Sequence, residues 1–114
     1  MSGTIIYLAC PYTDPSFEVR TFRFEAATKA AATLIKRGRI VFSPVTMTHP
    51  LDAVLAGSQN TLGTEFWTSF DEAFMEFCGE MIILRLDGWR ESAGIRREQA
   101  FFESKGRAIS FMDP

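Results

Sequence analysis

The stretch IIYLACPYTDPS, residues 5–16, sets the fold class that the sequence predicts. Its first part, Ile5–Ala9, is a short continuous apolar run that stops at a Cys-Pro pair, which is typical of a strand buried in a parallel sheet. The second part is a loop in which Asp14 or Ser16 can cap a following helix. The stretch therefore predicts a strand that leads directly into a helix, the repeating step of an α/β fold.

Strands and helices alternate along the rest of the chain. The alternation predicts right-handed crossovers and a doubly wound, flavodoxin- or Rossmann-like parallel sheet of four to five strands with helices on both faces. A length of 114 residues predicts one domain over residues 1–114. The expected helices are Phe17–Arg37 (ended by Gly38), Glu65–Cys78 and Ser92–Lys105; the expected further strands are Arg39–Phe42, Met81–Leu86 and Ala108–Met112; and a long loop, weakly helical near Leu51–Ala56, is expected over Thr46–Thr64.

Composition narrows the class of partner. The net charge is −2 and no basic run is present, which argues against a surface for duplex nucleic acid but not against a small anionic ligand. The N-terminus does not resemble a signal peptide and no apolar run approaches the ~20 residues of a membrane span. We therefore expect a cytoplasmic protein with Cys10 and Cys78 reduced. The 11 Phe and two Trp are many for this length and predict an aromatic pocket or a subunit interface.

Two carboxylates lie on helix faces that should be buried. At three- and four-residue spacing, the neighbours of Glu98 include Ile95, Phe101 and Phe102, and those of Asp71 are similarly apolar. An unpaired buried charge costs several kcal/mol or shifts its pKa, so such a group generally has a partner or a function. One alternative is a structural ion pair with a nearby arginine, namely Arg20, Arg23 or Arg85.

The ends of the predicted strands supply the other candidates. In parallel sheets ligands bind beyond the carboxyl ends of the strands, which indicates residues 9–14, 43–50 and 86–94. Ser92 and Gly94 open a helix and suit an anion such as phosphate, although simple N-capping explains them as well. Arg20 and Arg23 either clamp that phosphate or form a solvated face. The predicted substrate-binding residues are Cys10, Pro11, Tyr12, Arg20, Arg23, His49, Trp67, Ser92 and Gly94.

Several of these residues also have a purely structural interpretation. Tyr7 is most simply a core tyrosine with a satisfied hydroxyl, and Tyr12 is expected to be an exposed aromatic that stacks on a base or sugar. His49 is the one histidine of the chain, so a multi-histidine metal site is excluded, and Cys10 is most simply a packing residue. P-loop, GxGxxG, GxSxG and zinc-deaminase motifs are absent from the sequence. We therefore predict no metal and no cofactor.

Four segments together resemble the nucleoside 2-deoxyribosyltransferase superfamily, which includes the deoxynucleoside 5′-monophosphate N-glycosidases: IIYLACPYTD, VFSPVTMTHP, EFWTSFDEAFMEFCGEMIIL and GWRESAGIRREQAFFESKGR. Within that superfamily the chain is most similar to the DUF1937-type branch. The likeness covers nearly the whole chain. Cys10 stands where the family's YLAGP segment usually has glycine, and residues 46–64 have no match from which base specificity can be transferred.

This resemblance implies an activity and a role for several residues. Glu98 matches the nucleophile that attacks the anomeric carbon of 2-deoxyribose, Asp71 the acidic residue near the leaving base, and Tyr7 the tyrosine that orients the nucleophile. Ser92 and Gly94 match the positions that hold the 5′ end of the nucleotide. The family's subunits complete each other's sites, so a homodimer or higher homo-oligomer is implied.

Three functions remain open at this stage. The first is cleavage of the N-glycosidic bond of a deoxynucleoside or deoxynucleoside 5′-monophosphate by hydrolysis or transfer. The second is a non-catalytic nucleotide-binding or sensing module, because fold does not fix function. The third is an interaction protein that uses its aromatic surface only to self-associate.

Overall fold

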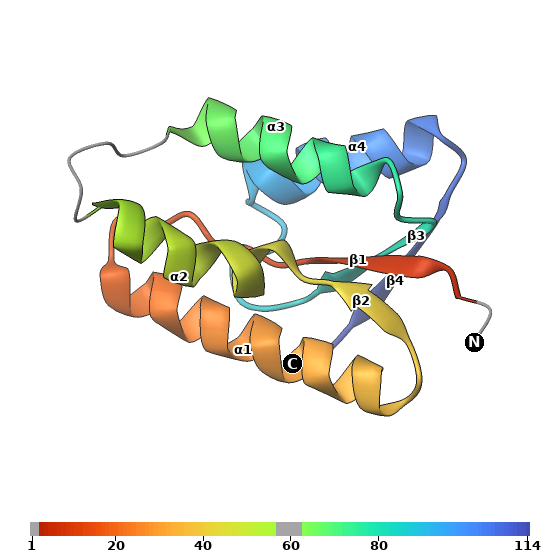
Figure 1. Ribbon diagram of the computed structural model, residues 1–114, viewed down its shortest axis with the longest axis horizontal. Coiled ribbons are helices and arrows are strands. Elements are labelled where there is room, and N and C mark those ends of the chain that lie inside the picture. Colours follow the sequence, from red (N-terminus) through yellow and green to blue (C-terminus); the bar gives the residue numbers. More distant parts are fainter. Residues whose placement is uncertain (1–2, 57–62) are drawn as a thin grey trace.

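The computed structural model describes residues 3–56 and 63–114, and within them four parallel strands form one sheet in the order β2-β1-β3-β4 (Figure 1). The strand order reverses direction between β1 and β3, which is the topological switch point of the sheet. The predicted doubly wound α/β fold is confirmed. The elements are β1 (Ile5–Ala9), α1 (Phe17–Lys36), β2 (Ile40–Phe42), α2 (Pro44–Ala56), α3 (Thr64–Met75), β3 (Glu80–Leu84), α4 (Ala93–Ser104) and β4 (Ala108–Met112).

The two faces of β1 belong to different cores. Ile6 and Leu8 are fully buried on the side of the sheet that α1 covers, together with Ala27 and other residues of α1. Tyr7 and Ala9, at alternate positions, are fully buried on the side covered by α3 and α4. Figure 1 shows α1 and α2 on one side of the sheet and α3 and α4 on the other. The period-2 alternation of the strand therefore points Tyr7 at α4.

Helix α1 begins and ends as its sequence predicts. The Ser16 hydroxyl accepts a hydrogen bond from the backbone N–H of Val19, and the Asp14 carboxylate holds the N–H of Ser16 at 2.9 Å. At the other end Gly38 has φ of 86°, and the N–H groups of Gly38 and Arg39 donate to the carbonyls of Ile35 and Leu34. This is a Schellman motif, which places a glycine where the left-handed conformation is required.

The long loop expected over Thr46–Thr64 is wrong over residues 46–50, because residues 44–56 form helix α2, whereas the weak helix expected near Leu51–Ala56 is confirmed as the second half of that helix. Pro50 lies inside this helix and suggested a break, since it has no N–H to donate to the preceding turn. Tertiary contacts with α1 hold the helix in place: Thr46 Oγ1 lies 3.0 Å from Thr28 Oγ1, and Val45 is buried in the α1-side core. Residues 57–62 of the expected loop lie outside the described residues.

Candidate active site

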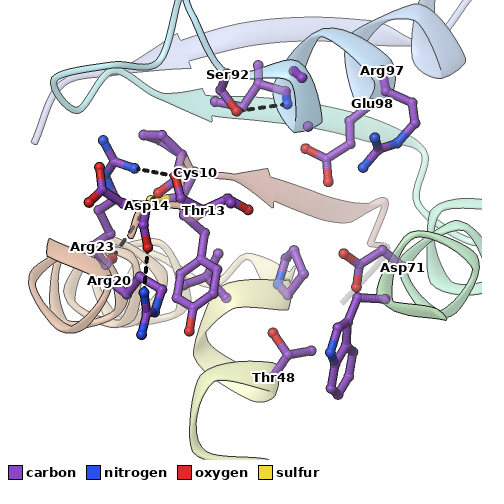
Figure 2. A pocket seen from close by; sticks show the side chains of 18 of the residues that line it. Cys10, Thr13, Asp14, Arg20, Arg23, Thr48, Asp71, Ser92, Arg97 and Glu98 are labelled. Atoms are coloured by element: carbon purple, nitrogen blue, oxygen red, sulfur yellow. Dashed lines mark hydrogen bonds between the residues drawn. The ribbon is translucent and has the colours of Figure 1, made fainter. Parts of the chain in front are cut away.

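A cavity of about 740 Å³ lies at the carboxyl ends of the central strands (Figure 2). Its volume is in the range of pockets that hold a small organic ligand. All three segments that the parallel-sheet rule indicated contribute to its wall, and α3 adds a fourth side. The lining residues are Cys10, Pro11, Tyr12, Thr13, Asp14, Arg20, Arg23, Pro44, Val45, Thr48, Asp52, Trp67, Thr68, Asp71, Gly88, Glu91, Ser92, Ala93, Gly94, Ile95, Arg97 and Glu98.

Glu98 is a buried carboxyl group that faces the cavity from α4. Only 9% of the residue is exposed, and the Tyr7 hydroxyl donates a hydrogen bond to its Oε2. The pairing joins β1 to α4 and fixes one carboxylate oxygen. Burial raises the pKa of Glu98 to about 7, against the lowering effects of the Tyr7 hydrogen bond and of the nearby Arg97 guanidinium. Burial and the Glu98 carboxylate raise the pKa of Tyr7, so this hydroxyl stays protonated as the donor.

Asp71 faces the same cavity from α3. Figure 2 shows the Asp71 and Glu98 carboxyl groups pointing into the cavity from neighbouring walls, formed by α3 and α4. Asp71 Oδ1 is covered by protein atoms and has no hydrogen-bond partner among residues 3–56 and 63–114. Burial raises the pKa of Asp71 to about 6, and Arg97 opposes the rise. The site therefore holds two carboxyl groups that gain a proton near neutral pH.

The alternative that these carboxylates are members of structural ion pairs is wrong for the three arginines considered. Arg85 pairs with Asp113 at 2.9 Å on the far side of β3. Arg20 donates to the backbone carbonyl of Asp14.

Arg23 likewise donates to backbone, to the carbonyls of Thr13 at 3.2 Å and Asp87 at 3.4 Å. It thereby ties the loop after β1 to the loop after β3. Gly88 permits this close approach, because a Cβ on its backbone would lie 2.9 Å from Arg23 Nη2. Arg20 and Arg23 both line the cavity, and their role as a phosphate clamp stays a prediction.

Arg97 is the residue of this site that sequence reasoning missed. The amphipathic pattern of α4 assigned it to the solvated face, but the structure places it on the cavity wall beside Glu98 (Figure 2). No ion pair or hydrogen bond engages its guanidinium within the part of the chain that the structure describes. Its charge lowers the pKa of both Asp71 and Glu98. The available signal was its position three residues after Gly94, at the start of the helix whose face lines the cavity.

A serine caps the N-terminus of α4 at the edge of the cavity. Ser92 is the N-cap, and its Oγ accepts from the Ile95 N–H at 3.2 Å. The N-capping interpretation of Ser92 is thus confirmed, while its hydroxyl and Gly94 also line the cavity.

Cys10 lines the cavity beside Pro11, and burial raises the pKa of its thiol to about 12. The Cys10 thiol is therefore neutral and unsuited to nucleophilic attack.

His49 is placed differently from its predicted role as a loop residue that contacts a ligand. It lies within α2, is 8% exposed and is not among the lining residues. Its Nδ1 lies 2.7 Å from the hydroxyl of Tyr12, which does line the cavity. Trp67 lines the cavity as predicted, from α3. The structure thus brings every predicted site residue to the cavity except Tyr7 and His49, each of which contacts a residue that lines it.

The described residues contain no group of three or more His, Cys, Asp or Glu side chains placed to hold a metal ion. Over the same residues, no helix has the length and apolar character needed to cross a bilayer.

Comparison with known proteins gives a family and a fold. Residues 4–114 match the family described as "Domain of unknown function (DUF1937)". The structure is similar to that of a 2-deoxyribosyltransferase from the psychrotolerant bacterium Bacillus psychrosaccharolyticus, with a TM-score of 0.66 and 20% sequence identity, over 97% of this chain and 73% of that chain. No curated protein matches the chain. At this identity the likeness shows that the two proteins share a fold.

Proposed function

The chain belongs to the DUF1937 family, and from that premise we propose that it cleaves the N-glycosidic bond of a 2′-deoxynucleoside or its 5′-monophosphate. One observation carries the proposal. Glu98 is buried, receives a hydrogen bond from Tyr7, and shares a cavity with Asp71, whose Oδ1 has no hydrogen-bond partner among the described residues, on a fold similar to that of a 2-deoxyribosyltransferase. A pair of carboxyl groups in one cavity is what glycosidic cleavage with a covalent intermediate requires.

The proposed reaction has two displacement steps. A Glu98 carboxylate oxygen attacks C1′ of the sugar, and the C1′–N bond breaks with its electron pair moving to the base. Asp71, in its protonated form, donates its proton to the departing base. Water, or the N–H nitrogen of a second base, then attacks C1′, loses a proton to the Asp71 carboxylate, and displaces Glu98. The products are the free base and either 2-deoxyribose, with or without its phosphate, or a new nucleoside.

The hydroxyl of Tyr7 supports the role of Glu98 as the nucleophile. Its hydrogen bond stabilises the ionised form of Glu98 and leaves the second carboxylate oxygen to face the substrate. Asp71 receives no such bond among the described residues, yet its pKa of about 6 lies below the pKa of about 7 of Glu98, so the last proton of the free pair is held mainly by Glu98. With Glu98 as the nucleophile and Asp71 as the acid, the proposed reaction therefore requires this proton to pass to Asp71 when the substrate binds.

The cations on the cavity wall support a 5′-monophosphate as the substrate. Arg20, Arg23 and Arg97 line the cavity together with the start of α4, where backbone N–H groups favour an anion. Arg97 has the guanidinium that no other described group engages. Of the three arginines, Arg97 is therefore the one that we most expect to bind the substrate phosphate.

A panel of 2′-deoxynucleosides and their 5′-monophosphates, incubated with the protein and analysed by chromatography, tests the proposal. We expect release of free base from at least one member, and formation of a new nucleoside if a second base is supplied. Binding without base release would favour the nucleotide-sensing alternative. A panel that neither binds nor reacts would overturn the proposal.

We also propose a homodimer or higher homo-oligomer. Phe66 and Phe74 of α3 and Phe77, just after the helix, are 44%, 37% and 76% exposed, which is a large exposure for three apolar side chains close together in the sequence. We expect light scattering at micromolar concentration to give at least twice the monomer mass of 12.8 kDa. A Phe77→Asp variant should shift the mass toward the monomer. A wild-type protein that is monomeric at that concentration would contradict the proposal.

The two carboxyls predict the pH dependence of the reaction. Because they face one cavity they titrate as a pair, with apparent pKa values of about 6 and about 7. The proposed reaction needs one proton on the pair, so kcat/KM should rise as the first proton leaves, peak between pH 6 and pH 7, and fall as the second leaves. A pH profile of base release measures this.

The Asp71→Asn variant is the matched control for the profile. It removes one titrating group, so the fall on the alkaline side should disappear, and the acid limb should follow the ionisation of Glu98 alone, whose pKa falls below about 7 once the Asp71 charge is removed. Its kcat should drop about a hundredfold because the acid is lost. A wild-type profile that keeps rising above pH 8 would contradict the role of Asp71 as an acid.

A further inference from the structure

His49 lies in an aromatic cluster behind the cavity wall. Its ring is stacked on Phe24, with ring centroids 4.4 Å apart and an interplanar angle of 23°, and more distantly on Phe17 at 6.1 Å. The Tyr12 ring meets it edge-on at 5.6 Å and 81°. The imidazole is thereby clamped between residues of α1 and the loop after β1, which leaves Nδ1 aimed at the Tyr12 hydroxyl.

Tyr12 is held from two directions. Its backbone lies next to Thr13 and Asp14, whose carbonyls accept hydrogen bonds from Arg23 and Arg20 of α1. Its side chain is held from α2, through the 2.7 Å contact between its hydroxyl and His49 Nδ1. The loop after β1 therefore presents a fixed aromatic ring on the cavity wall before any ligand arrives, and such preorganisation favours binding.

We propose that His49 is a positioning residue that accepts the Tyr12 hydroxyl hydrogen bond at Nδ1 and so fixes the Tyr12 ring as the wall against which the planar base of the substrate lies. The identification of the ligand group as a nucleobase rests on the proposed function. A phenol hydroxyl that donates to Nδ1 places the imidazole proton on Nε2. His49 acts only through Tyr12, because it does not line the cavity.

The first test needs no activity. His49 is the one histidine of the chain, so its two ring nitrogen signals in a ¹⁵N spectrum are assigned without ambiguity. We expect the spectrum at neutral pH to show a proton on Nε2 and a hydrogen-bonded acceptor at Nδ1. The Tyr12→Phe variant should move the Nδ1 signal toward that of a ring whose Nδ1 has no donor. Signals that are identical in the two proteins would overturn the pairing.

The second test asks whether the pairing positions substrate. In His49→Asn the side-chain oxygen occupies nearly the place of Nδ1 and can still accept, whereas His49→Leu cannot. For the best substrate of the panel we expect His49→Leu to raise KM about fivefold to tenfold, the value of one lost hydrogen bond, and to change kcat less. His49→Asn should restore KM to within about threefold of the wild type.

A double-mutant cycle separates positioning from a general structural role. If His49 acts through the Tyr12 hydroxyl, His49→Leu should change KM less than about twofold in the Tyr12→Phe background. An equal loss in both backgrounds would overturn the inference. If the wild type is active and His49→Leu has an unchanged KM, the inference alone fails. If the wild type neither binds nor cleaves any compound while the Tyr12–His49 pairing is seen by ¹⁵N, the proposed function fails and the assignment of the base fails with it.

Discussion

Replacing Glu98 by Gln is expected to reduce base release at least a thousandfold, on the order of 4 kcal/mol of transition-state stabilisation. Glutamine keeps the shape of the side chain and an oxygen that accepts the Tyr7 hydrogen bond, but it cannot attack C1′ or neutralise an oxocarbenium-like transition state. Because binding of the ground state is little affected, KM should stay within a few-fold of the wild-type value. Single-turnover and steady-state assays of base release measure both parameters.

Glu103 provides the matched control, since it lies on the same helix and is exposed. Glu103→Gln changes the same functional group on α4 and should leave the rate of base release within about twofold of the wild type. Tyr7→Phe should fall between the two, because it removes the hydrogen bond that favours the ionised nucleophile but leaves the carboxyl in place. Full activity of Glu98→Gln would refute the proposed nucleophile even if the protein proved to be a glycosidase.

The pairing of Tyr7 with Glu98 shows which parts of the site hydrophobic periodicity can predict and which it cannot. The two residues are 91 positions apart in the chain. A buried strand at Ile5–Ala9 and an amphipathic helix near residues 93–104 could both be predicted from short-range pattern. The rule that ligands bind at the carboxyl ends of parallel strands then brought their ends to one cavity. Their contact was implied only by the resemblance to the 2-deoxyribosyltransferase superfamily, because periodicity does not say which residue of a strand meets which residue of a helix.

Other parts of the site depend on contacts that no local pattern encodes. Only the second half of α2 was expected, as a weak helix near Leu51–Ala56, because Pro50 interrupts the helical signal, while the packing of Val45 and Thr46 that stabilises the first half is tertiary. His49 was consequently read as a loop residue free to meet a ligand. Arg97 was missed for a different reason. A helical wheel sorts residues into a buried face and a solvent-exposed face, but the cavity lies at the boundary between these two faces of α4, and Arg97 lines it there.

The burial of Glu98 also predicts an effect on stability that is independent of any activity. Its pKa in the folded state is about 7, above the value of 4.5 for an unperturbed glutamate, so the folded protein retains a proton that the unfolded chain releases. The contribution of this group to stability is fully present below pH 4.5 and is lost as the pH rises through 7. Glu98→Gln carries no ionisable group there and avoids that loss.

Chemical denaturation at pH 5 and pH 8 measures the free energy of unfolding of Glu98→Gln and of the wild type. Between pH 5 and pH 8, the free energy of unfolding of the variant should rise relative to that of the wild type by on the order of 2 kcal/mol. Glu103→Gln should differ from the wild type by less than about 0.5 kcal/mol at both pH values. A variant that is stabilised while it loses catalysis is the mark of a residue kept for function at the expense of the fold. If Glu98→Gln were less stable than the wild type at pH 8, the carboxylate would be a structural member of the core, and its inward orientation would need no substrate to explain it.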